Sequence, residues 1–257
     1  MKRMPSWGRT DAADPTGRHC EGDPMSATWM QTARRLLPRL AGLLREIRPT
    51  FHLDSVKDLN AGRLRDLGVE AVLWDVDGTL MAHHAGGVDP ALAAGFEDLL
   101  GAPGLRHAIV SNCQEARFAE LGEIFPAIPV VLGYETGAGA AFRVRRGPRE
   151  SWRGPGAAAA SSDGGWPPGE LRPIRKPSRG LVHAALEELN IADRPAAALL
   201  VGDQYFTDIA SANLAGVRSV KVPTLQRASF PAPVRWSQRL EAVLYRLKYG
   251  RPRPDGA

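Results

Sequence analysis

The sequence predicts an α/β fold, a Rossmann-like parallel sheet with helices on both faces. Short apolar runs rich in β-branched residues recur from residue 70 onward, and stretches with the apolar spacing of a helix separate them. The runs are almost continuously apolar, as expected of parallel strands that are covered on both faces. With 257 residues, of which 44% are hydrophobic, the chain is long enough to form one large core.

Five strands alternate with four helices in this prediction. The predicted strands are 70–75, 106–111, 128–133, 197–202 and 218–222. The predicted helices are 89–100, 114–124, 180–190 and 206–215. Parallel strands end at a common edge of the sheet, and ligands bind there, near the point where the strand order reverses.

Other segments flank or interrupt this domain. Residues 134–172 are rich in Gly, Ala, Pro, Ser and Arg and show little periodicity, so we expect a flexible insertion. Leucines at helical spacing, accompanied by arginines, predict an amphipathic helix near each end of the chain. The expected parts are a disordered N-terminal arm at 1–28, a basic amphipathic helix at 29–48, the α/β domain at 49–233, and a basic helix with a tail at 234–257.

Basic residues are concentrated in three segments of a chain whose net charge is +5: residues 29–50, 143–179 and 234–257. This pattern favours an anionic partner such as a membrane surface, whereas sparse aromatic residues for base stacking argue against nucleic acid. Ordinary solvated surfaces are the alternative. The two cysteines imply no disulfide framework, and no apolar run approaches the roughly 20 residues of a membrane span, so we expect a cytoplasmic protein.

Polar residues follow the predicted strands at the expected binding edge. Burying carboxylates is costly unless a cation or hydrogen bonds compensate the charge. Clustered acids favour a hard cation, and oxygen ligands suit Mg²⁺ best. The candidates are Asp75 and Asp77 after the first strand, Ser111 and Asn112 after the second, Lys176 before the third helix, and Asp203 and Asp208 after the fourth strand.

These residues occur in the order Asp-x-Asp-Gly-Thr, Ser-Asn, Lys and Gly-Asp-x-x-x-x-Asp, which resembles the motifs of the haloacid dehalogenase (HAD) superfamily of phosphotransferases. The resemblance implies a HAD-like core for the α/β domain. Aspartate at both Asp75 and Asp77 favours a phosphatase over a dehalogenase, because a second carboxyl is needed to protonate the leaving alkoxide.

The resemblance also implies a role for each matching position. Asp75 would attack phosphorus to form an aspartyl-phosphate, and Asp77 would protonate the leaving oxygen and then activate water. Mg²⁺ would be held by the Asp75 carboxylate, the Asp77 carbonyl and Asp203, with Asp208 nearby. Lys176 would offset the negative charge of the nucleophile and the transferring group. The substrate-binding groups would be Ser111, Asn112 and the backbone amides at Gly78 and Thr79.

The intervals between these motifs are short. Residues 80–111 hold a flap, one helix and one strand, and residues 112–176 hold a helix, a strand and the low-complexity insertion. Neither interval is expected to contain a folded cap domain. An open site of this kind admits a large substrate, such as a lipid headgroup.

A narrower resemblance covers most of residues 49–250. The stretch "RPTFHLDSVKDLNAGRLRDLGVEAVLWDVDGTL" is similar to the lead-in of the YqeG family, and "VGDQYFTDIASANLAGVRSVKVP" and "RLEAVLYRLK" are similar to its later segments. It implies a Mg²⁺-dependent phosphomonoester hydrolase of phospholipid biosynthesis that converts phosphatidylglycerophosphate to phosphatidylglycerol. We expect the two basic helices to hold such an enzyme peripherally on the inner face of the membrane. The alternatives are a soluble nucleotide or sugar phosphatase, and a non-catalytic basic scaffold or nucleic-acid-binding module.

Overall fold

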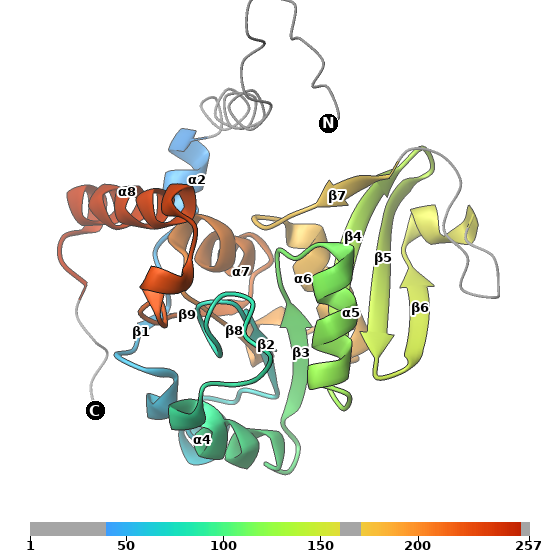
Figure 1. Ribbon diagram of the computed structural model, residues 1–257, viewed down its shortest axis with the longest axis horizontal. Coiled ribbons are helices and arrows are strands. Elements are labelled where there is room, and N and C mark those ends of the chain that lie inside the picture. The colour runs from blue at the N-terminus through green and yellow to red at the C-terminus, as the bar shows by residue number, and fades with distance from the viewer. Residues whose placement is uncertain (1–39, 160–170, 253–257) are drawn as a thin grey trace, which may run out of the picture. The chain divides into compact units, whose positions relative to one another are not determined.

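One sheet of nine strands organises residues 40–159 and 171–252, the part of the chain that the computed structural model describes (Figure 1). Contacts divide the chain after Leu40, and the described residues from Ala41 onward belong to one unit. The strand order is β1-β9-β8-β2-β3-β4-β5-β6, and β7 pairs with β4. The strands are β1 (Phe51–His52), β2 (Ala71–Trp74), β3 (Arg106–Val110), β4 (Val130–Thr136), β5 (Gly139–Arg146), β6 (Arg149–Arg153), β7 (Arg172–Ile174), β8 (Ala198–Gly202) and β9 (Arg218–Lys221).

The predicted parallel sheet is confirmed. All five predicted strands are present as β2, β3, β4, β8 and β9, and each pairs in parallel with its neighbour in the order β9-β8-β2-β3-β4. The chain leaves β2 toward β3 and β4 on one side and returns to β8 and β9 on the other side. The strand order therefore reverses between β2 and β8, which is the point where a binding site is expected.

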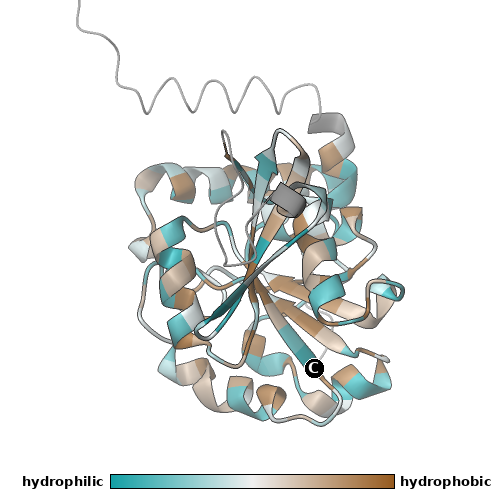
Figure 2. Cartoon of the chain, turned by 90° about the vertical axis from the view of Figure 1, so that its right-hand side faces the viewer, coloured by the Kyte–Doolittle hydropathy of each residue, from teal (hydrophilic) through white to brown (hydrophobic). Residues whose placement is uncertain are grey.

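Helices cover both faces of the parallel strands, and the hydrophobic strands lie between them (Figure 2). In β2, Val72 and Trp74 belong to the core on one face of the sheet, which the helices between residues 61 and 124 cover. Ala71 and Leu73 belong to the core on the other face, which the helices between residues 179 and 214 cover. This alternation explains why the strand is apolar throughout. The α-helices are α2 (Leu40–Glu46), α3 (Ala61–Asp66), α4 (Pro90–Leu100), α5 (Glu115–Ile124), α6 (Arg179–Glu188), α7 (Ala210–Leu214) and α8 (Ala232–Tyr249). The shorter helical turns are η2 (Val56–Asp58), η3 (Pro155–Ala159), η4 (Pro195–Ala197), η5 (Tyr205–Ile209, a π-helical turn) and η6 (Arg227–Ser229).

The prediction of a flexible insertion at 134–172 is wrong for the described residues of this segment. The strands β5 and β6 extend the sheet in antiparallel pairing beyond β4, and β7 returns along β4. The strand β5 does alternate over Phe142–Arg145, but the surrounding Gly-, Ala- and Pro-rich composition suggested a loop. Phe142 and Val144 are buried, while Arg143 and Arg145 pair with Glu150 of β6.

The terminal helices are only partly within the described residues. The predicted arm at 1–28 and the first part of the predicted helix at 29–48 lie outside them, and α2 is the described remainder. At the other end, α8 extends over Ala232–Tyr249 and ends before Gly250. None of the helices in residues 40–159 and 171–252 is long and apolar enough to cross a membrane.

A buried histidine under the sheet predicts a stability change at acidic pH. Nε1 of Trp74 donates to Nδ1 of His107 at 3.1 Å, so Nε2 carries the proton and donates to the Leu99 carbonyl at 3.0 Å. Burial lowers the pKa of His107 to about 4, and a second ring proton would meet the Trp74 N–H. Between pH 6.5 and 4 the unfolded chain therefore binds a proton that the folded chain does not.

The free energy of unfolding should consequently fall by about 3 kcal/mol from this group as the pH drops from 6.5 to 4. Urea titrations across that range should measure a smaller pH dependence for His107→Gln than for the unmodified chain. An equal slope in His107→Gln would contradict the assignment.

Candidate active site

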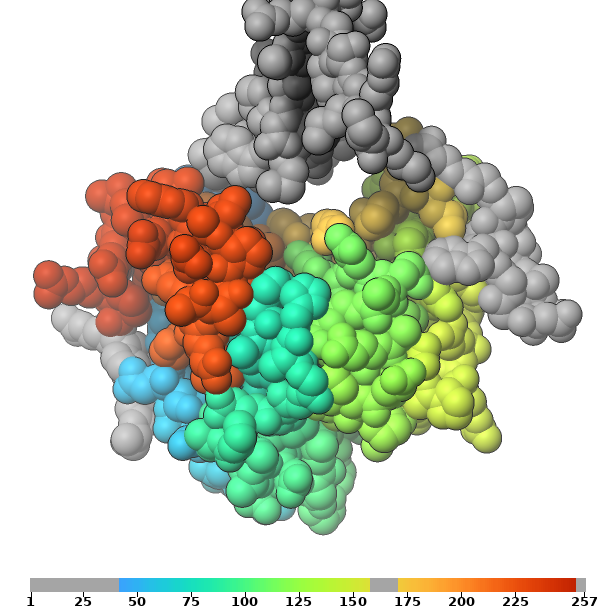
Figure 3. Space-filling view, in the orientation of Figure 1, coloured from blue at the N-terminus to red at the C-terminus, as the bar shows by residue number. Residues whose placement is uncertain are grey.

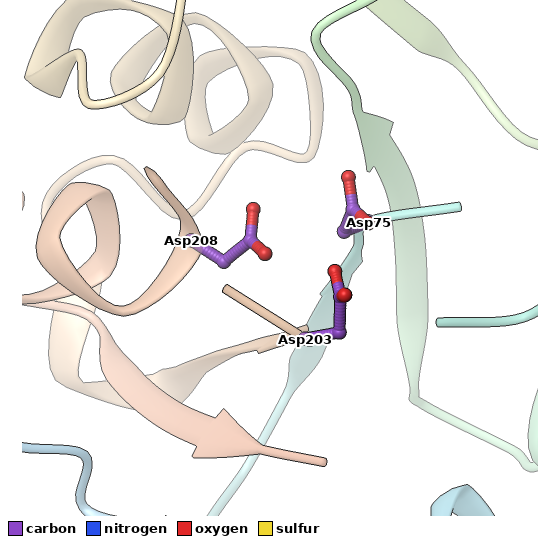
Figure 4. Close-up of side chains that lie close together, drawn as sticks. All are labelled: Asp75, Asp203 and Asp208. Carbon is purple, nitrogen blue, oxygen red and sulfur yellow. The ribbon is translucent and has the colours of Figure 1, made fainter. Parts of the chain in front are cut away.

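Three buried carboxylates converge at the point where the strand order reverses. One oxygen from each of Asp75, Asp203 and Asp208 lies within 4.8 Å of the others. Asp75 follows β2, Asp203 follows β8, and Asp208 lies in η5 (Figure 4). The clustering of the two strand-end aspartates with Asp208 agrees with the arrangement that the motifs predict.

The backbone explains why these three side chains meet. Because β2 and β8 pair with Trp74 opposite Val201, the next residue, Asp75, donates its N–H to the Val201 carbonyl at 2.9 Å. Gly202 then allows η5 to fold back over the strand end. A Cβ at Gly202 would lie 2.3 Å from the Cβ of Asp208, a distance that no side chain tolerates. Glycine at this position is therefore required for the cluster.

Lys176 links two of the carboxylates. Its buried Nζ donates to Oδ1 of Asp75 and to Oδ1 of Asp208, each at 2.6 Å. The lysine reaches the site because β7 pairs with the carboxyl end of β4, and the chain leaves β7 directly toward Lys176. Asn112 fixes this approach, since it accepts from the Lys176 N–H at 2.7 Å and donates to the Lys176 carbonyl at 3.3 Å.

The cluster carries more negative than positive charge. Burial raises the pKa of Asp75 to about 7 and raises that of Asp203 well above its ordinary value, against the effect of nearby cations. Burial acts to lower the pKa of Lys176, but Asp208 and Asp75 outweigh it and hold that pKa above its ordinary value. Lys176 therefore stays charged and forms ion pairs with two of the three carboxylates, while Lys221 acts on Asp203 only through its charge.

The residues fit a divalent cation. Oδ1 of Asp203 is buried and has no hydrogen-bond partner among the described residues. An unpartnered carboxylate oxygen in a cluster with excess negative charge is costly unless an ion completes it. Oxygen donors alone, without His or Cys, match the ligand preference of Mg²⁺. The group that could hold the ion is Asp75, Asp203 and Asp208.

The turn after Asp75 is closed by its own hydrogen bonds. Thr79 donates its hydroxyl to Oδ2 of Asp75 at 3.1 Å, so its side chain orients the carboxylate. Gly78 has φ of 91°, a conformation that favours glycine, and its N–H donates to the Met81 carbonyl at 2.7 Å. The Thr79 N–H donates to the Val76 carbonyl at 3.1 Å. Because both amides already have partners, phosphate binding by them stays a prediction that requires these bonds to open.

The carboxylate of Asp77 lies apart from the cluster and is held by Arg117. Nη2 of Arg117 is 2.7 Å from Oδ1, Nε is 3.4 Å from Oδ2, and the His84 N–H donates to Oδ1 at 3.0 Å. The Arg117 side chain is only 3% exposed. It also donates to the Ala85 carbonyl, so α5 is tied to the flap at the same point.

Several of these contacts were not predicted. Arg117 lies within a helix and belongs to none of the motifs, so only the tertiary contact reveals it. The same is true of Gln238 in α8, which donates to Oδ2 of Asp203 at 3.2 Å. Ser111 is buried directly after β3, and Asn112 contacts Lys176 as described above; substrate binding by these two residues stays a prediction.

Comparison with known proteins identifies a related class. A family described as "HAD-hyrolase-like" matches residues 173–227, the segment that contains Lys176, Asp203 and Asp208. Among solved structures, an uncharacterized protein from Listeria monocytogenes serotype 4b matches 65% of this chain and 88% of its own, at 18% identity and a TM-score of 0.37. A similarity at that TM-score supports no inference. No curated protein matches the sequence.

The α/β fold with its mainly parallel sheet and the buried acidic cluster are consistent with a HAD-like core, which the family match over residues 173–227 supports. The match supports a place for the chain in the HAD superfamily. Membership of the YqeG family within it remains a prediction.

Proposed function

We propose that the protein is a Mg²⁺-dependent phosphomonoester hydrolase that forms an aspartyl-phosphate on Asp75. The observation that carries the proposal is the buried group of Asp75, Asp203 and Asp208, crosslinked by Lys176 at the point where the strand order reverses. Such a group has little structural purpose without a cation and an anionic ligand, because burying three carboxylates opposes folding.

The residues of the chain divide the chemistry between them. An oxygen of Asp75 attacks phosphorus, the bond from phosphorus to the ester oxygen breaks, and the leaving oxygen receives a proton from Asp77. Water then attacks the aspartyl-phosphate and gives a proton to Asp77, which releases phosphate and restores Asp75. Bound Mg²⁺ supplies charge that screens the carboxylates from the phosphoryl group. Lys176 keeps Asp75 oriented through the 2.6 Å contact to Oδ1.

Asp77 has to change partners during this cycle. Its carboxylate pairs with Arg117, and in that form it can accept a proton from water. Donation to the leaving group instead requires a protonated carboxyl that has separated from the guanidinium. Arg117 is therefore a positioning residue that holds Asp77 beside the flap between the two proton transfers.

Asp77→Asn is expected to slow release of alkyl phosphates by about 10²–10⁴-fold, and to slow the first step with p-nitrophenyl phosphate much less. The reason is that p-nitrophenolate leaves without a proton, whereas an alkoxide does not. Single-turnover rates with both esters measure the difference. Asp66→Asn, at the exposed end of α3, is the control, and an equal loss with both esters would contradict proton donation by Asp77.

We further propose that the ester belongs to a phospholipid headgroup, phosphatidylglycerophosphate. The resemblance of the segment before β2 to the YqeG family supports this substrate. So does the arrangement between the motifs, since the described residues of 80–111 and 112–176 belong to the flap, the sheet and its covering helices. An open site suits a headgroup that stays attached to a bilayer.

Phosphate release from a panel of esters tests both the hydrolase activity and the choice of a lipid substrate. The panel contains phosphatidylglycerophosphate in mixed micelles, nucleoside monophosphates, sugar phosphates and p-nitrophenyl phosphate, each with Mg²⁺ and with EDTA. The expected result is Mg²⁺-dependent release with the highest kcat/KM for the lipid. A higher value for a nucleotide or sugar phosphate would reject the lipid substrate, and no release from any ester would reject the hydrolase.

A further inference from the structure

The outward side of α8 carries an apolar stripe. Only five large hydrophobic residues are exposed in the described part of the chain, and four of them lie on α8. They are Trp236, Leu240, Val243 and Leu247, exposed by 67%, 57%, 49% and 79%, and we call them the α8 stripe. Figure 3 shows α8, in red, at the surface of the molecule.

The spacing of the stripe places it on one side of the helix. Its members follow one another by four, three and four residues, which is the repeat of a single helical face. The opposite side carries Gln238, Glu241 and Tyr245, which are buried against the domain. The helix thus turns its more apolar side away from the core. A contiguous exposed apolar surface of this kind indicates an interaction site.

Basic residues border the stripe. Arg239 and Arg246 lie along one edge, and both are exposed. Lys248, beyond the other edge, donates its Nζ to the Leu44 carbonyl of α2 at 2.7 Å. The guanidinium of Arg239 lies over the Trp236 ring, 5.4 Å from its centroid. The single acid in the helix, Glu241, is buried on the opposite side. The outward side of α8 is therefore apolar in the middle and cationic along one edge.

These properties select one kind of partner. A second copy of the chain would bring two cationic borders together, and their repulsion would oppose pairing of the stripes. An anionic bilayer offers acyl chains to the stripe and negatively charged headgroups to Arg239 and Arg246, with Trp236 at the boundary. We propose that α8 lies in the headgroup region of an anionic membrane, with Trp236, Leu240, Val243 and Leu247 inserted.

The inward side of α8 connects this surface to the acidic cluster. Gln238 donates to Oδ2 of Asp203 at 3.2 Å, and Glu241 accepts the Tyr205 N–H, which begins η5, at 2.8 Å. A helix that rests on the bilayer therefore also contacts a residue of the cluster and the turn that carries Asp208. Taken with the proposed hydrolase function, on which this step rests, docking of α8 would hold the acidic cluster about one helix diameter, roughly 10 Å, from the bilayer surface.

Vesicle binding by the full chain tests the surface without reference to activity. The probe is a vesicle of phosphatidylcholine with phosphatidylglycerol, compared with phosphatidylcholine alone, and the readout is flotation at low and high salt. The full chain should bind the anionic vesicles at low salt. The variant Trp236→Ser/Leu240→Ser/Leu247→Ser should lose binding by at least about 100-fold, because apolar burial is removed.

One further variant and two controls separate the apolar contribution to vesicle binding from the electrostatic one. Arg239→Gln/Arg246→Gln should weaken binding to anionic vesicles by about tenfold or more and reduce its salt dependence. Arg65→Gln/Arg149→Gln, which removes two exposed arginines elsewhere, should leave binding unchanged. Leu214→Ser, at the fifth exposed hydrophobic residue, is the matched control for the serine variant. Because the replaced side chains are exposed, the variants should keep the fold, which circular dichroism checks.

A spectroscopic readout reports on the stripe directly. Trp236 fluorescence should shift to shorter wavelength on addition of anionic vesicles, and the shift should be absent in Trp236→Phe. Full binding by the serine variant would overturn the proposal. The proposal would also be overturned if sedimentation showed that the unmodified chain is a dimer and that the serine variant loses the dimer but keeps vesicle binding.

These experiments distinguish failure of the membrane-surface proposal from failure of the hydrolase proposal. If the stripe variant loses vesicle binding and no ester is hydrolysed by any form, the membrane surface is supported and the hydrolase proposal fails. If both hold, the ratio of the hydrolysis rate for a phosphate ester in vesicles to that for p-nitrophenyl phosphate should fall in the stripe variant and not in Leu214→Ser.

Discussion

Asp75→Asn is expected to reduce Mg²⁺-dependent phosphate release by at least about 10⁴-fold, because an amide oxygen cannot serve as the attacking nucleophile. The substitution keeps the shape of the side chain: Lys176 can still donate to the remaining oxygen, and the Thr79 hydroxyl, which donates to Oδ2 of Asp75, can accept from the new amide NH₂. Continuous measurement of phosphate at saturating ester provides the rate. Quenching with acid should also trap a phosphorylated form of the unmodified chain and none in Asp75→Asn.

The loss of rate should occur without loss of stability. Burial raises the pKa of Asp75 to about 7, which means that its charged form opposes folding above that pH in the absence of metal. A neutral amide removes this cost, so the free energy of unfolding at pH 8 in EDTA should be equal to or higher than that of the unmodified chain. Asp54→Asn, at an exposed position before η2, is the control and should change neither quantity. Residual activity above 10% in Asp75→Asn would exclude this residue as the nucleophile.

Removal of Mg²⁺ should have the second largest effect, lowering phosphate release on the order of 10³-fold or more and reducing thermal stability. Without metal, Asp75 retains a proton in the folded chain that the unfolded chain releases near pH 4. The metal-free protein therefore loses stability as the pH rises from about 4 to about 7. Bound Mg²⁺ requires the deprotonated carboxylates, so its stabilising effect should be largest above pH 7.

The size of this effect can be stated for a given metal concentration. At free Mg²⁺ 100 times above Kd the stabilisation is about 2.7 kcal/mol. For a chain of this length that corresponds to a rise in Tm of about 5–10 °C. Thermal unfolding at pH 6 and pH 8, with Mg²⁺ or EDTA, measures it. Asp203→Asn should abolish the Mg²⁺-dependent rise, and equal Tm values in Mg²⁺ and EDTA at pH 8 would argue against a metal site.

Much of the fold could be predicted because its signals are local. The apolar runs at β2, β3, β4, β8 and β9 have the length and composition of buried strands, and the helices between them have the expected spacing. The positions of Asp75 and Asp203 at strand ends follow from the same runs. Since strands in parallel neighbours end at one edge, the meeting of these two aspartates needs no further information.

The antiparallel part of the sheet was missed for a physical reason. Strand patterns are recognised by alternation of apolar and polar residues, and β6 (Arg149–Arg153) offers little of it. Its stability in the sheet depends on partners from elsewhere, such as the ion pairs between Arg143 or Arg145 of β5 and Glu150. Such pairs form only once the strands are aligned, so composition alone suggested a flexible segment.

The site shows the same division. By itself, the sequence determined that acids, a hydroxyl and a lysine reach one edge of a parallel sheet, because residue spacing controls where each strand ends. Only the tertiary structure decided that Asp77 pairs with Arg117 apart from the cluster, that Lys176 bridges Asp75 and Asp208, and that the apolar side of α8 faces outward. Local periodicity shows which residues share a face of a helix or strand. Which face is buried depends on the packing of segments far apart in the chain, and this information is not carried by any local pattern.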